Sequence, residues 1–291
     1  MKQLAVLSGK GGTGKTTIVS AFIKLARNKA FADCDVDAPN LHLVCSRYEG
    51  LENRLFYGYQ KAVKYDDICT NCGKCEELCR FRAIENGIVN PYECEGCGVC
   101  EAFCPTRDHE GRPAIRLEDN VSGDISLFRV NGEVFSSAQL KMGNGASGKL
   151  VTEVRKNLFN SITKEELVII DGSPGIGCPV IASITGVDMV LIVAEPTLSG
   201  MHDMKRIIDT ARKFHAICAV CINKYDINVN NALEIEQYCI GENIPLVGSI
   251  PFDPMVIKAV NAGKTIIDMP KSTAAQAISE IWNNVHSMLI K

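Results

Sequence analysis

Short apolar runs alternate along the chain with longer stretches whose apolar residues recur at helical spacing. Stretches of the second kind, such as Thr16–Arg27 and His202–Phe214, predict helices. The apolar runs predict buried strands at Leu4–Leu7, Ala30–Ala32, Leu167–Ile170, Met189–Ala194 and Ile217–Ile222. Strands that are apolar throughout are typical of a parallel sheet covered on both faces. The pattern therefore predicts an α/β fold with a mostly parallel sheet between two layers of helices.

A hairpin and a final helix complete the predicted elements. Ser126–Val130 and Glu133–Ser136 flank Asn131-Gly132, a dipeptide suited to a tight turn with positive φ angles. The last predicted helix, about Thr273–Leu289, has an apolar face but almost no basic residues. We therefore expect it to pack on the sheet and not to anchor the chain to a membrane.

Cysteine is concentrated in one block of the chain. Of the 14 cysteines, eight fall between Cys69 and Cys104. The chain is neither short nor signal-bearing, so a secreted disulfide scaffold is excluded and the block indicates metal binding. The block also interrupts the alternation of strands and helices. We expect one α/β domain made of residues 1–62 and 108–291, with a small domain inserted at 63–107.

Charge and hydropathy exclude several other classes of protein. The formal net charge is −3, which gives no electrostatic reason to expect nucleic acid or an anionic membrane as a partner. No run approaches about 18 consecutive apolar residues, the length that suggests a membrane-spanning helix. The apolar run at the N-terminus leads directly into a glycine-rich loop, so we interpret it as a strand and expect a cytoplasmic protein.

The loop after the first predicted strand fits a phosphate-binding pattern. Gly9–Thr16 matches G-x-x-x-x-G-K-[ST], and a predicted helix follows it. In such a loop, backbone N–H groups surround phosphate oxygens at the positive end of the helix. Lys15 would reach the β and γ phosphates, and the Thr16 hydroxyl would bind Mg²⁺. The residues expected to contact the nucleotide here are Gly11, Gly12, Thr13, Gly14, Lys15, Thr16 and Thr17.

Aspartates follow two of the predicted strands. Asp171 comes directly after Leu167–Ile170, the position of a Walker B aspartate that anchors Mg²⁺. Asp33, Asp35 and Asp37 follow the second strand, and one of them could orient the attacking water or contact Mg²⁺ through water. For each of these three, a role in a turn or a helix cap is the alternative.

The cysteine block contains two quartets with the same spacing. Cys69-x2-Cys72-x2-Cys75-x3-Cys79 is followed by Cys94-x2-Cys97-x2-Cys100-x3-Cys104-Pro105. This is the pattern of bacterial ferredoxins with two [4Fe–4S] clusters, in which each fourth cysteine binds the other cluster. Cluster one then uses Cys69, Cys72, Cys75 and Cys104, and cluster two uses Cys94, Cys97, Cys100 and Cys79. A pair of zinc sites is the alternative. Cys79 precedes Arg80 where ferredoxins usually carry proline.

Several of these motifs together resemble one superfamily. Lys10, directly after the first glycine of the phosphate loop, is the deviant Walker A feature of the MinD/ParA/Mrp/nitrogenase-iron-protein superfamily of P-loop ATPases. More closely, the chain resembles MinD-like members with an inserted ferredoxin domain. Asp33–Leu41 is similar to their switch I and Asp171–Pro179 to their switch II. Further matches are Ser147–Val151, Glu195–Thr197 and Pro251–Asp253.

The resemblance implies a role for individual residues. Lys10 would reach the partner's phosphates across a nucleotide-dependent homodimer, and Asp35 would be the catalytic aspartate of switch I. Asn223 would recognise adenine, with Pro251 lining the base pocket. ATP or ADP with Mg²⁺ is the expected ligand. The alternative is GTP, because Asn223–Asp226 also fits the N-K-x-D pattern that reads guanine.

Six cysteines lie outside the quartets: Cys34, Cys45, Cys178, Cys218, Cys221 and Cys239. Cys218 and Cys221 form C-x-x-C within an apolar strand, so we expect them to be buried. Cys178 lies seven residues after Asp171, and resembles the switch II cysteine that holds a dimer-bridging cluster in the nitrogenase iron protein. The second ligand cysteine of that protein has no match here, so an inert Cys178 remains the alternative.

The combination predicts nucleotide-gated electron transfer. ATP binding would order the switches and close a dimer, and two [4Fe–4S] clusters would exchange electrons with an unidentified protein partner. Two other classes stay open. One is a carrier or scaffold ATPase that assembles iron–sulfur clusters, and the other is a partitioning or positioning ATPase.

Overall fold

The computed structural model describes residues 1–43, 52–130 and 133–290. Cys45 and the predicted turn Asn131-Gly132 lie outside the described residues. Contacts between residues divide the chain into two compact units. Unit 1 consists of Met1–Asn53, Ile125–Gln139 and Gly148–Lys291, and unit 2 consists of Arg54–Asp124 and Leu140–Ser147.

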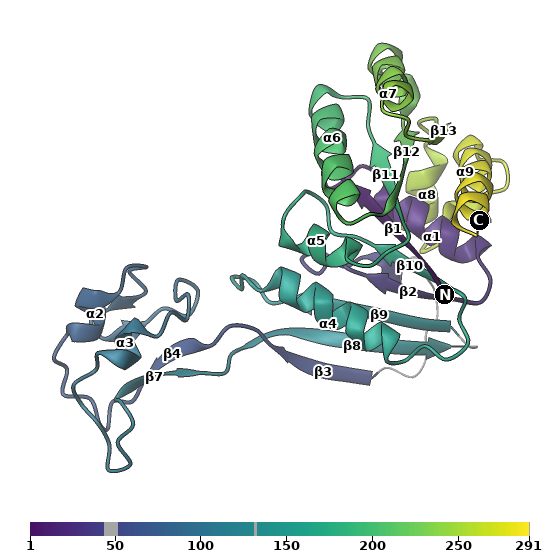
Figure 1. Ribbon diagram of the computed structural model, residues 1–291. Helices are drawn as coiled ribbons and strands as arrows, with labels where there is room; N and C mark the ends of the chain where they lie inside the picture. Colours follow the sequence, from purple (N-terminus) through teal and green to yellow (C-terminus); the bar gives the residue numbers. More distant parts are fainter. Residues whose placement is uncertain (44–51, 131–132, 291) are drawn as a thin grey trace. The chain divides into compact units, whose positions relative to one another are not determined.

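The described residues form a nine-stranded sheet, most of which belongs to unit 1 (Figure 1). In sheet order the strands are β13 (Leu246–Ile250), β12 (Ile217–Asn223), β11 (Met189–Ala194), β1 (Lys2–Ser8), β10 (Leu167–Asp171), β2 (Lys29–Asp33), β9 (Glu133–Leu140), β8 (Val121–Val130) and β3 (Glu52–Tyr57). Every pairing of neighbouring strands from β13 through β9 is parallel. The predicted mostly parallel sheet is therefore confirmed.

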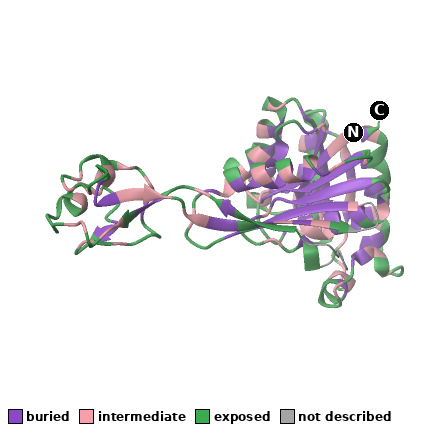
Figure 2. Cartoon of the chain, turned by 90° about the horizontal axis from the view of Figure 1, so that it is seen from below, coloured by how far each residue is buried: buried purple, intermediate pink, exposed green. Residues whose placement is uncertain are grey.

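Helices cover both faces of this sheet, which is why its strands are apolar throughout (Figures 1 and 2). α1 (Lys15–Leu25) and α9 (Thr273–Leu289) share one core with the strands, where the rings of Phe22 and Trp282 lie 5.0 Å apart. α4 (Ser147–Phe159), α5 (Cys178–Ile184) and α6 (Leu198–Lys213) cover the other face. The helices α7 (Val229–Gly241) and α8 (Met255–Asn261) complete the unit. The last helix packs on the sheet as its apolar face predicted.

The carboxyl ends of three neighbouring strands bring the predicted nucleotide residues together. β1 ends at Ser8, and the phosphate loop connects it to α1. β1 pairs with β10, which in turn pairs with β2, so that Asp171 and Asp33 lie directly opposite each other. In open parallel sheets, ligands bind at this edge.

Unit 2 is small and is built on a pair of antiparallel strands. β4 (Lys61–Lys64) pairs with β7 (Ile115–Glu118), and the short strands β5 (Ile84–Glu85) and β6 (Ile88–Val89) form a second pair. Two short helices, α2 (Lys74–Leu78) and α3 (Val99–Ala102), follow Gly73 and Gly98. Both glycines have a positive φ, 73° and 75°, a conformation that favours glycine at the start of each helix.

The interior of unit 2 contains few apolar side chains. The buried core cluster beside its cysteines consists of Ala62, Ala83, Ile84, Cys94 and Ile115. The partly buried residues packed against this core are Cys75, Cys79, Val89, Cys100, Cys104 and Leu117. Sulfur therefore makes up much of the interior. A unit of this size with so small a core typically depends on metal or disulfide crosslinks for its stability.

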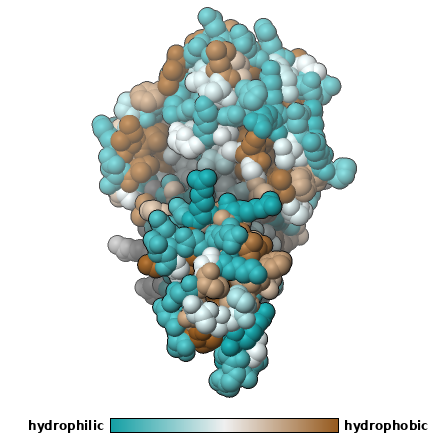
Figure 3. Space-filling view, turned by 90° about the vertical axis from the view of Figure 1, so that its left-hand side faces the viewer, coloured by the Kyte–Doolittle hydropathy of each residue, from teal (hydrophilic) through white to brown (hydrophobic). Residues whose placement is uncertain are grey.

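The surface is mixed in polarity. Figure 3 shows hydrophobic side chains in small groups among hydrophilic ones over the face that it presents. None of the helices in the described part of the chain combines the length and the apolar character that crossing a membrane requires.

Candidate nucleotide site and cysteine cavities

The phosphate loop borders a groove of about 230 Å³ in unit 1. The residues that line this groove are Ser8, Lys10–Thr17, Asp35 and Asn40. Gly12 and Gly14 adopt positive φ angles of 80° and 87°, which turn the loop around the groove. The structure thus gathers every residue that the sequence predicted for the phosphates, together with Asp35. Lys10 is exposed at this groove.

One lysine of the loop is paired with the end of β10. Nζ of Lys15 lies 2.5 Å from Oδ1 of Asp171 and 4.0 Å from Oδ2 of Asp35. The Thr16 hydroxyl donates to Oδ2 of Asp171 at 2.7 Å. Burial disfavours the charge of Lys15, but the carboxylates, Asp171 first among them, outweigh it and raise the pKa of Lys15. The two groups expected to bind Mg²⁺, the Thr16 hydroxyl and the Asp171 carboxylate, therefore already lie side by side.

The buried carboxylate of Asp33 holds the backbone of the predicted switch I segment in place. Its carboxylate accepts backbone hydrogen bonds from Asp35 at 3.0 Å, Asn40 at 3.1 Å and Leu41 at 3.0 Å. Burial, with the facing carboxylate of Asp171, raises the pKa of Asp33 to about 7. Burial also raises the pKa of Asp35, although Lys15 opposes the shift. Asp33, the last residue of β2, thus has a structural role, and of the two aspartates that follow it Asp35 is the one that lines the groove.

A second cavity, of about 250 Å³, continues from the groove. Asn223 and Pro251 line it, as the sequence predicted for a base pocket. Gly12, Gly14 and Thr17 line both the cavity and the groove, so one nucleotide could occupy the two. The Asn223 amide donates to the carbonyl oxygen of Thr13 at 2.7 Å. This hydrogen bond holds Asn223 against the phosphate loop, where the cavity and the groove meet.

Two neighbouring residues have contacts that the sequence did not reveal. Oδ1 of Asp226 accepts from the backbone N–H of Phe252 at 2.8 Å, so this carboxylate shapes the base cavity. Nζ of Lys224 lies 2.6 Å from Oε1 of Glu195 and 3.4 Å from the carbonyl oxygen of Gly12. The N-K-x-D pattern left guanine recognition by Asp226 as an alternative. The hydrogen bond with the backbone of Phe252 shows that Asp226 also has a structural role, which the pattern does not reveal.

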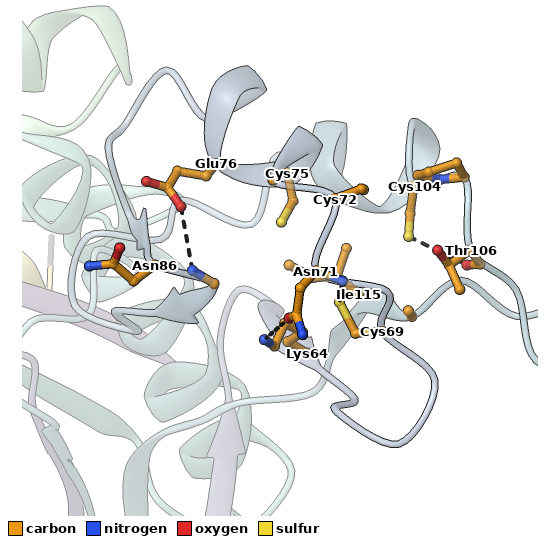
Figure 4. A pocket seen from close by; sticks show the side chains of 14 residues that line it. Lys64, Cys69, Asn71, Cys72, Cys75, Glu76, Asn86, Cys104, Thr106 and Ile115 are labelled. Carbon is orange, nitrogen blue, oxygen red and sulfur yellow. Dashed lines mark hydrogen bonds between the residues drawn. The ribbon is translucent and has the colours of Figure 1, made fainter.

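The eight quartet cysteines of unit 2 line two separate cavities. Cavity one, of about 260 Å³, is lined by Cys69, Cys72, Cys75 and Cys104, which Figure 4 shows around a common space. Cavity two is lined by Cys79, Cys94, Cys97 and Cys100. The last cysteine of each quartet therefore lines the cavity of the other quartet: Cys104 lies in cavity one and Cys79 in cavity two. Each cavity presents the four thiols that the ferredoxin pattern assigned to one cluster.

In each cavity, one backbone N–H group donates a hydrogen bond to a cysteine sulfur. The N–H of Asn71 donates to Sγ of Cys69 at 3.4 Å, and the N–H of Ala62 donates to Sγ of Cys94 at 3.4 Å. Gly96, at a φ of 64°, would place a Cβ 2.2 Å from the carbonyl oxygen of Gln60, so that no side chain fits there. Within the described ranges, no group of three or more His, Cys, Asp or Glu side chains is arranged so that it could hold a metal ion.

The remaining described cysteines differ in their exposure. Cys34, Cys221 and Cys239 are buried, and burial raises the pKa of the Cys34 and Cys221 thiols to about 12. Cys218, in the same strand as Cys221, is only partly buried. Cys178 is exposed at the start of α5.

Comparisons with known proteins agree with the geometry of unit 1. Residues 4–266 match the family model described as the CobQ/CobB/MinD/ParA nucleotide binding domain. An uncharacterized protein of Methanocaldococcus jannaschii, MJ0578, is 32% identical over 99% of this chain and 97% of its own length. The iron-sulfur cluster carrier protein of Pyrococcus furiosus is 23% identical over 96% of this chain and 83% of its own length.

Among solved structures, the septum site-determining protein MinD from Pyrococcus horikoshii, complexed with Mg-ADP, has the same fold. The TM-score is 0.58 and the sequence identity 17%, over 98% of this chain and 95% of that chain.

Proposed function

The chain belongs to the CobQ/CobB/MinD/ParA nucleotide-binding family and is an ATP-hydrolysing P-loop protein, and from this premise we propose that its nucleotide state gates electron transfer through two [4Fe–4S] clusters. The electrons would pass one at a time between a low-potential donor and an acceptor protein. Unit 1 would supply the switch and unit 2 the clusters.

We propose one task for each residue that lies beside the groove or the base cavity. Lys15 would leave Asp171 and bind the β and γ phosphates, since a phosphate chain carries more negative charge than one carboxylate. Asp171 and the Thr16 hydroxyl, 2.7 Å apart, would then hold Mg²⁺. Asp35, which lines the groove, would orient the attacking water. Asn223 and Pro251 would hold the adenine.

Lys10 would complete the site from a second copy of the chain. It is exposed at the rim of the groove, whereas Lys15 is buried within it. A cation at the rim can reach the phosphates of a facing subunit in a homodimer that forms around ATP. This arrangement would couple nucleotide binding to dimer closure.

The redox part of the proposal rests on one observation, namely which of the eight cysteines line each of the two cavities. Each cavity is lined by three closely spaced cysteines from one quartet and the last cysteine of the other quartet. Two independent zinc sites built from sequential quartets would not require this exchange, whereas two-cluster ferredoxins do. Four thiolates can hold a cubane cluster, which supplies a one-electron redox centre when bound. The small apolar core of unit 2 also fits a unit that two such clusters stabilise.

The second candidate function is iron–sulfur cluster delivery. It is favoured by the similarity to the iron-sulfur cluster carrier protein of Pyrococcus furiosus. A carrier must release its cluster, so its ligands should be labile. The cysteines of unit 2 are instead distributed over eight positions that enclose two cavities, and this arrangement favours resident clusters.

The experiment that tests the proposal is anaerobic purification followed by analysis and ATPase assay. We expect about eight iron and eight acid-labile sulfide per chain. We also expect the ATPase rate to differ between the dithionite-reduced and the oxidised protein. Stoichiometric zinc without sulfide would exclude the clusters. Transfer of iron and sulfide to an apo-ferredoxin on ATP addition, with loss from the donor, would favour the carrier.

A further inference from the structure

Helix α4 begins where the chain leaves unit 2 and returns to unit 1. Leu140–Ser147 is the second segment of unit 2, and Gly148 is the first residue of the unit 1 segment that follows it. Ser147 is also the first residue of α4, so no loop separates the helix from unit 2. A helix is a stiff element, and any displacement of α4 would therefore act directly on Leu140–Ser147.

The same helix contacts α5 near both of its ends. A Cβ on Gly148 would lie 3.0 Å from Cβ of Cys178, so the backbone of α4 lies against the first residue of α5. About two turns further along α4, the buried Arg155 donates to the carbonyl oxygens of Ala182 and Thr185, at 2.7 Å in each case. These carbonyls lie at the C-terminal end of α5, where a cation is favourable. The two helices are thus joined along the length of α5.

Helix α5 grows directly out of the predicted switch II, Asp171–Pro179, whose last two residues are its first two. Another part of this segment is held at the nucleotide groove. The N–H of Gly175 donates at 3.0 Å to the carbonyl oxygen of Ser8, which lines the groove. Asp171, where the segment begins, is paired with Lys15 and is expected to exchange it for Mg²⁺. Nucleotide binding therefore acts on the segment from which α5 starts.

On the other side of α4, one side chain joins Leu140–Ser147 to the rest of unit 2. Oδ1 of Asn144 accepts from Nδ2 of Asn120 at 2.9 Å and from the Ser122 hydroxyl at 3.0 Å. Ser122 is fully buried, and a Cβ on Gly58 would lie 2.4 Å from its Oγ. Gly58 lies three residues before β4 and Asn120 two residues after β7. This strand pair lines both cysteine cavities.

We propose that Arg155 and Asn144 are positioning residues that carry the state of the predicted switch II to the cysteine cavities through α4. The inference rests on the proposed gating function and assigns its route. Mg-ATP displaces the predicted switch II together with α5, Arg155 makes α4 follow, and Asn144 passes the displacement to the strands β4 and β7. The step from one unit to the other is covalent, at the peptide bond between Ser147 and Gly148.

The test is hydrogen–deuterium exchange of the intact, cluster-loaded protein with and without a slowly hydrolysed Mg-ATP analogue, together with redox titration. In the wild type, the analogue should change the exchange rates in the predicted switch II, in α4 and in Leu140–Ser147, and should shift a cluster midpoint. Asn144→Ala should keep the response of α4 and lose that of Leu140–Ser147. The factor by which the analogue changes the ratio of reduced to oxidised cluster should fall at least about twofold in this variant.

Three further variants separate transmission from a merely structural role. Asn144→Asp keeps the accepting oxygen and should behave as the wild type. Arg155→Lys keeps the charge but cannot reach both carbonyls of α5, so the response should already be lost in α4. Asn160→Ala is the matched control, because Asn160 is an exposed asparagine just beyond the opposite end of α4, and it should change nothing.

Iron, sulfide and ATP affinity are measured first and should be equal in all of these proteins. If Asn144→Ala loses iron, Ser122→Ala, which removes one of the two hydrogen bonds, replaces it. Loss of iron in both would show that the contact is only structural and would overturn the proposal. A full midpoint shift in Asn144→Ala, or an exchange response confined to the predicted switch II, would also overturn it. A wild type in which α4 and Leu140–Ser147 respond while both midpoints stay constant supports the route and contradicts the gating function.

Discussion

Nζ of Lys15 and Oδ1 of Asp171 lie 2.5 Å apart, although 156 residues separate them in the sequence. Both side chains are buried, and this ion pair joins the phosphate loop to the end of β10. The Lys15 ammonium, expected to bind the phosphates, and the Asp171 carboxylate, expected to bind Mg²⁺, are therefore paired with each other. Binding of Mg-ATP would therefore exchange one ion pair for two new contacts, a lysine with phosphate and a carboxylate with the metal.

Two lysines of the loop should have separable effects. Lys15→Ala should abolish nucleotide binding, because the buried ammonium is the one aimed at the phosphates, and it would also leave Asp171 buried without its ion-pair partner. Lys10→Ala should lower the ATPase rate by at least about a hundredfold while nucleotide affinity changes little. Calorimetric titration with ATP and a phosphate-release assay measure the two quantities.

Lys149→Ala is a suitable control for these variants, since this lysine lies outside the groove and the base cavity. Light scattering with and without a slowly hydrolysed ATP analogue should show a dimer for the wild type and a weakened dimer for Lys10→Ala. Full turnover by Lys10→Ala would disprove the trans-acting role.

The pKa of Asp33 predicts how the stability of the nucleotide-free protein changes with pH. Its pKa is about 7 in the folded chain, against an ordinary value of 3.8, because burial and the facing Asp171 disfavour its charge. Between these values only the folded protein retains the proton, so the free energy of unfolding should fall as the pH rises from about 4 to about 7.

The measurement is the thermal unfolding midpoint of the wild type and of Asp33→Asn across this pH range. Asn cannot titrate, so its midpoint should fall less steeply than that of the wild type. A constant offset between the two proteins reflects the hydrogen bonds that Asp33 accepts and does not bear on the prediction. Parallel curves would show that Asp33 does not hold the proton.

Sequence patterns predicted unit 1 well because its strands are apolar throughout. β11 and α9 have the predicted bounds, and the other strands predicted from apolar runs differ by one or two residues at their ends. The predicted hairpin strands are too short: β8 begins five residues earlier and β9 ends four residues later than predicted. α6 begins at Leu198, before the predicted His202, because Oγ1 of Thr197 accepts from the N–H of Gly200 and caps the helix. The spacing of apolar residues, from which the helix was predicted, does not reveal a capping contact of this kind.

The pairs that shape unit 2 could not be predicted from local pattern. Lys61–Lys64 has two lysines in four residues and does not resemble a buried strand, yet it pairs with Ile115–Glu118 more than 50 residues later. The cysteine spacing predicted the two ligand sets. The position of Lys64 depends on the strand register, and the sequence gives no indication of it.

The exchange of the fourth cysteines predicts the outcome of two single substitutions. Cys79→Ser should perturb the cluster in cavity two, although Cys79 belongs to the first quartet in sequence, and Cys104→Ser should perturb the cluster in cavity one. Each variant should lose up to about four of about eight iron ions. The test is iron analysis with Mössbauer spectra of protein labelled with ⁵⁷Fe.

Cys218→Ser, which changes a partly buried cysteine of β12, should retain all the iron. Combining each substitution with a second one identifies the cluster that is lost. Cys79→Ser with Cys97→Ser should lose no more iron than Cys79→Ser alone, whereas Cys79→Ser with Cys72→Ser should lose nearly all of it. The opposite result would assign the fourth cysteines in sequence order.

Nucleotide state and cluster potential should be coupled if unit 1 gates unit 2. Asp35 precedes unit 2 in the chain and Asp171 follows it, and the four connections of its two segments all lead into the unit that binds the nucleotide. Coupling between two sites is reciprocal: if Mg-ATP shifts a cluster potential, reduction must shift ATP affinity by the same free energy. A typical coupling of about 1–3 kcal/mol corresponds to roughly 40–130 mV for a one-electron couple.

Redox titration with and without a slowly hydrolysed Mg-ATP analogue measures one side of this relation, and ATP binding to the reduced and oxidised protein measures the other. The two free energies should agree, and both should vanish in Lys15→Ala, which retains the clusters but not the nucleotide. Potentials that stay the same with and without nucleotide would mean that the two units are independent. The chain would then be an ATPase tethered to a ferredoxin-like unit, and the gating proposal would have to be abandoned while the clusters themselves remained.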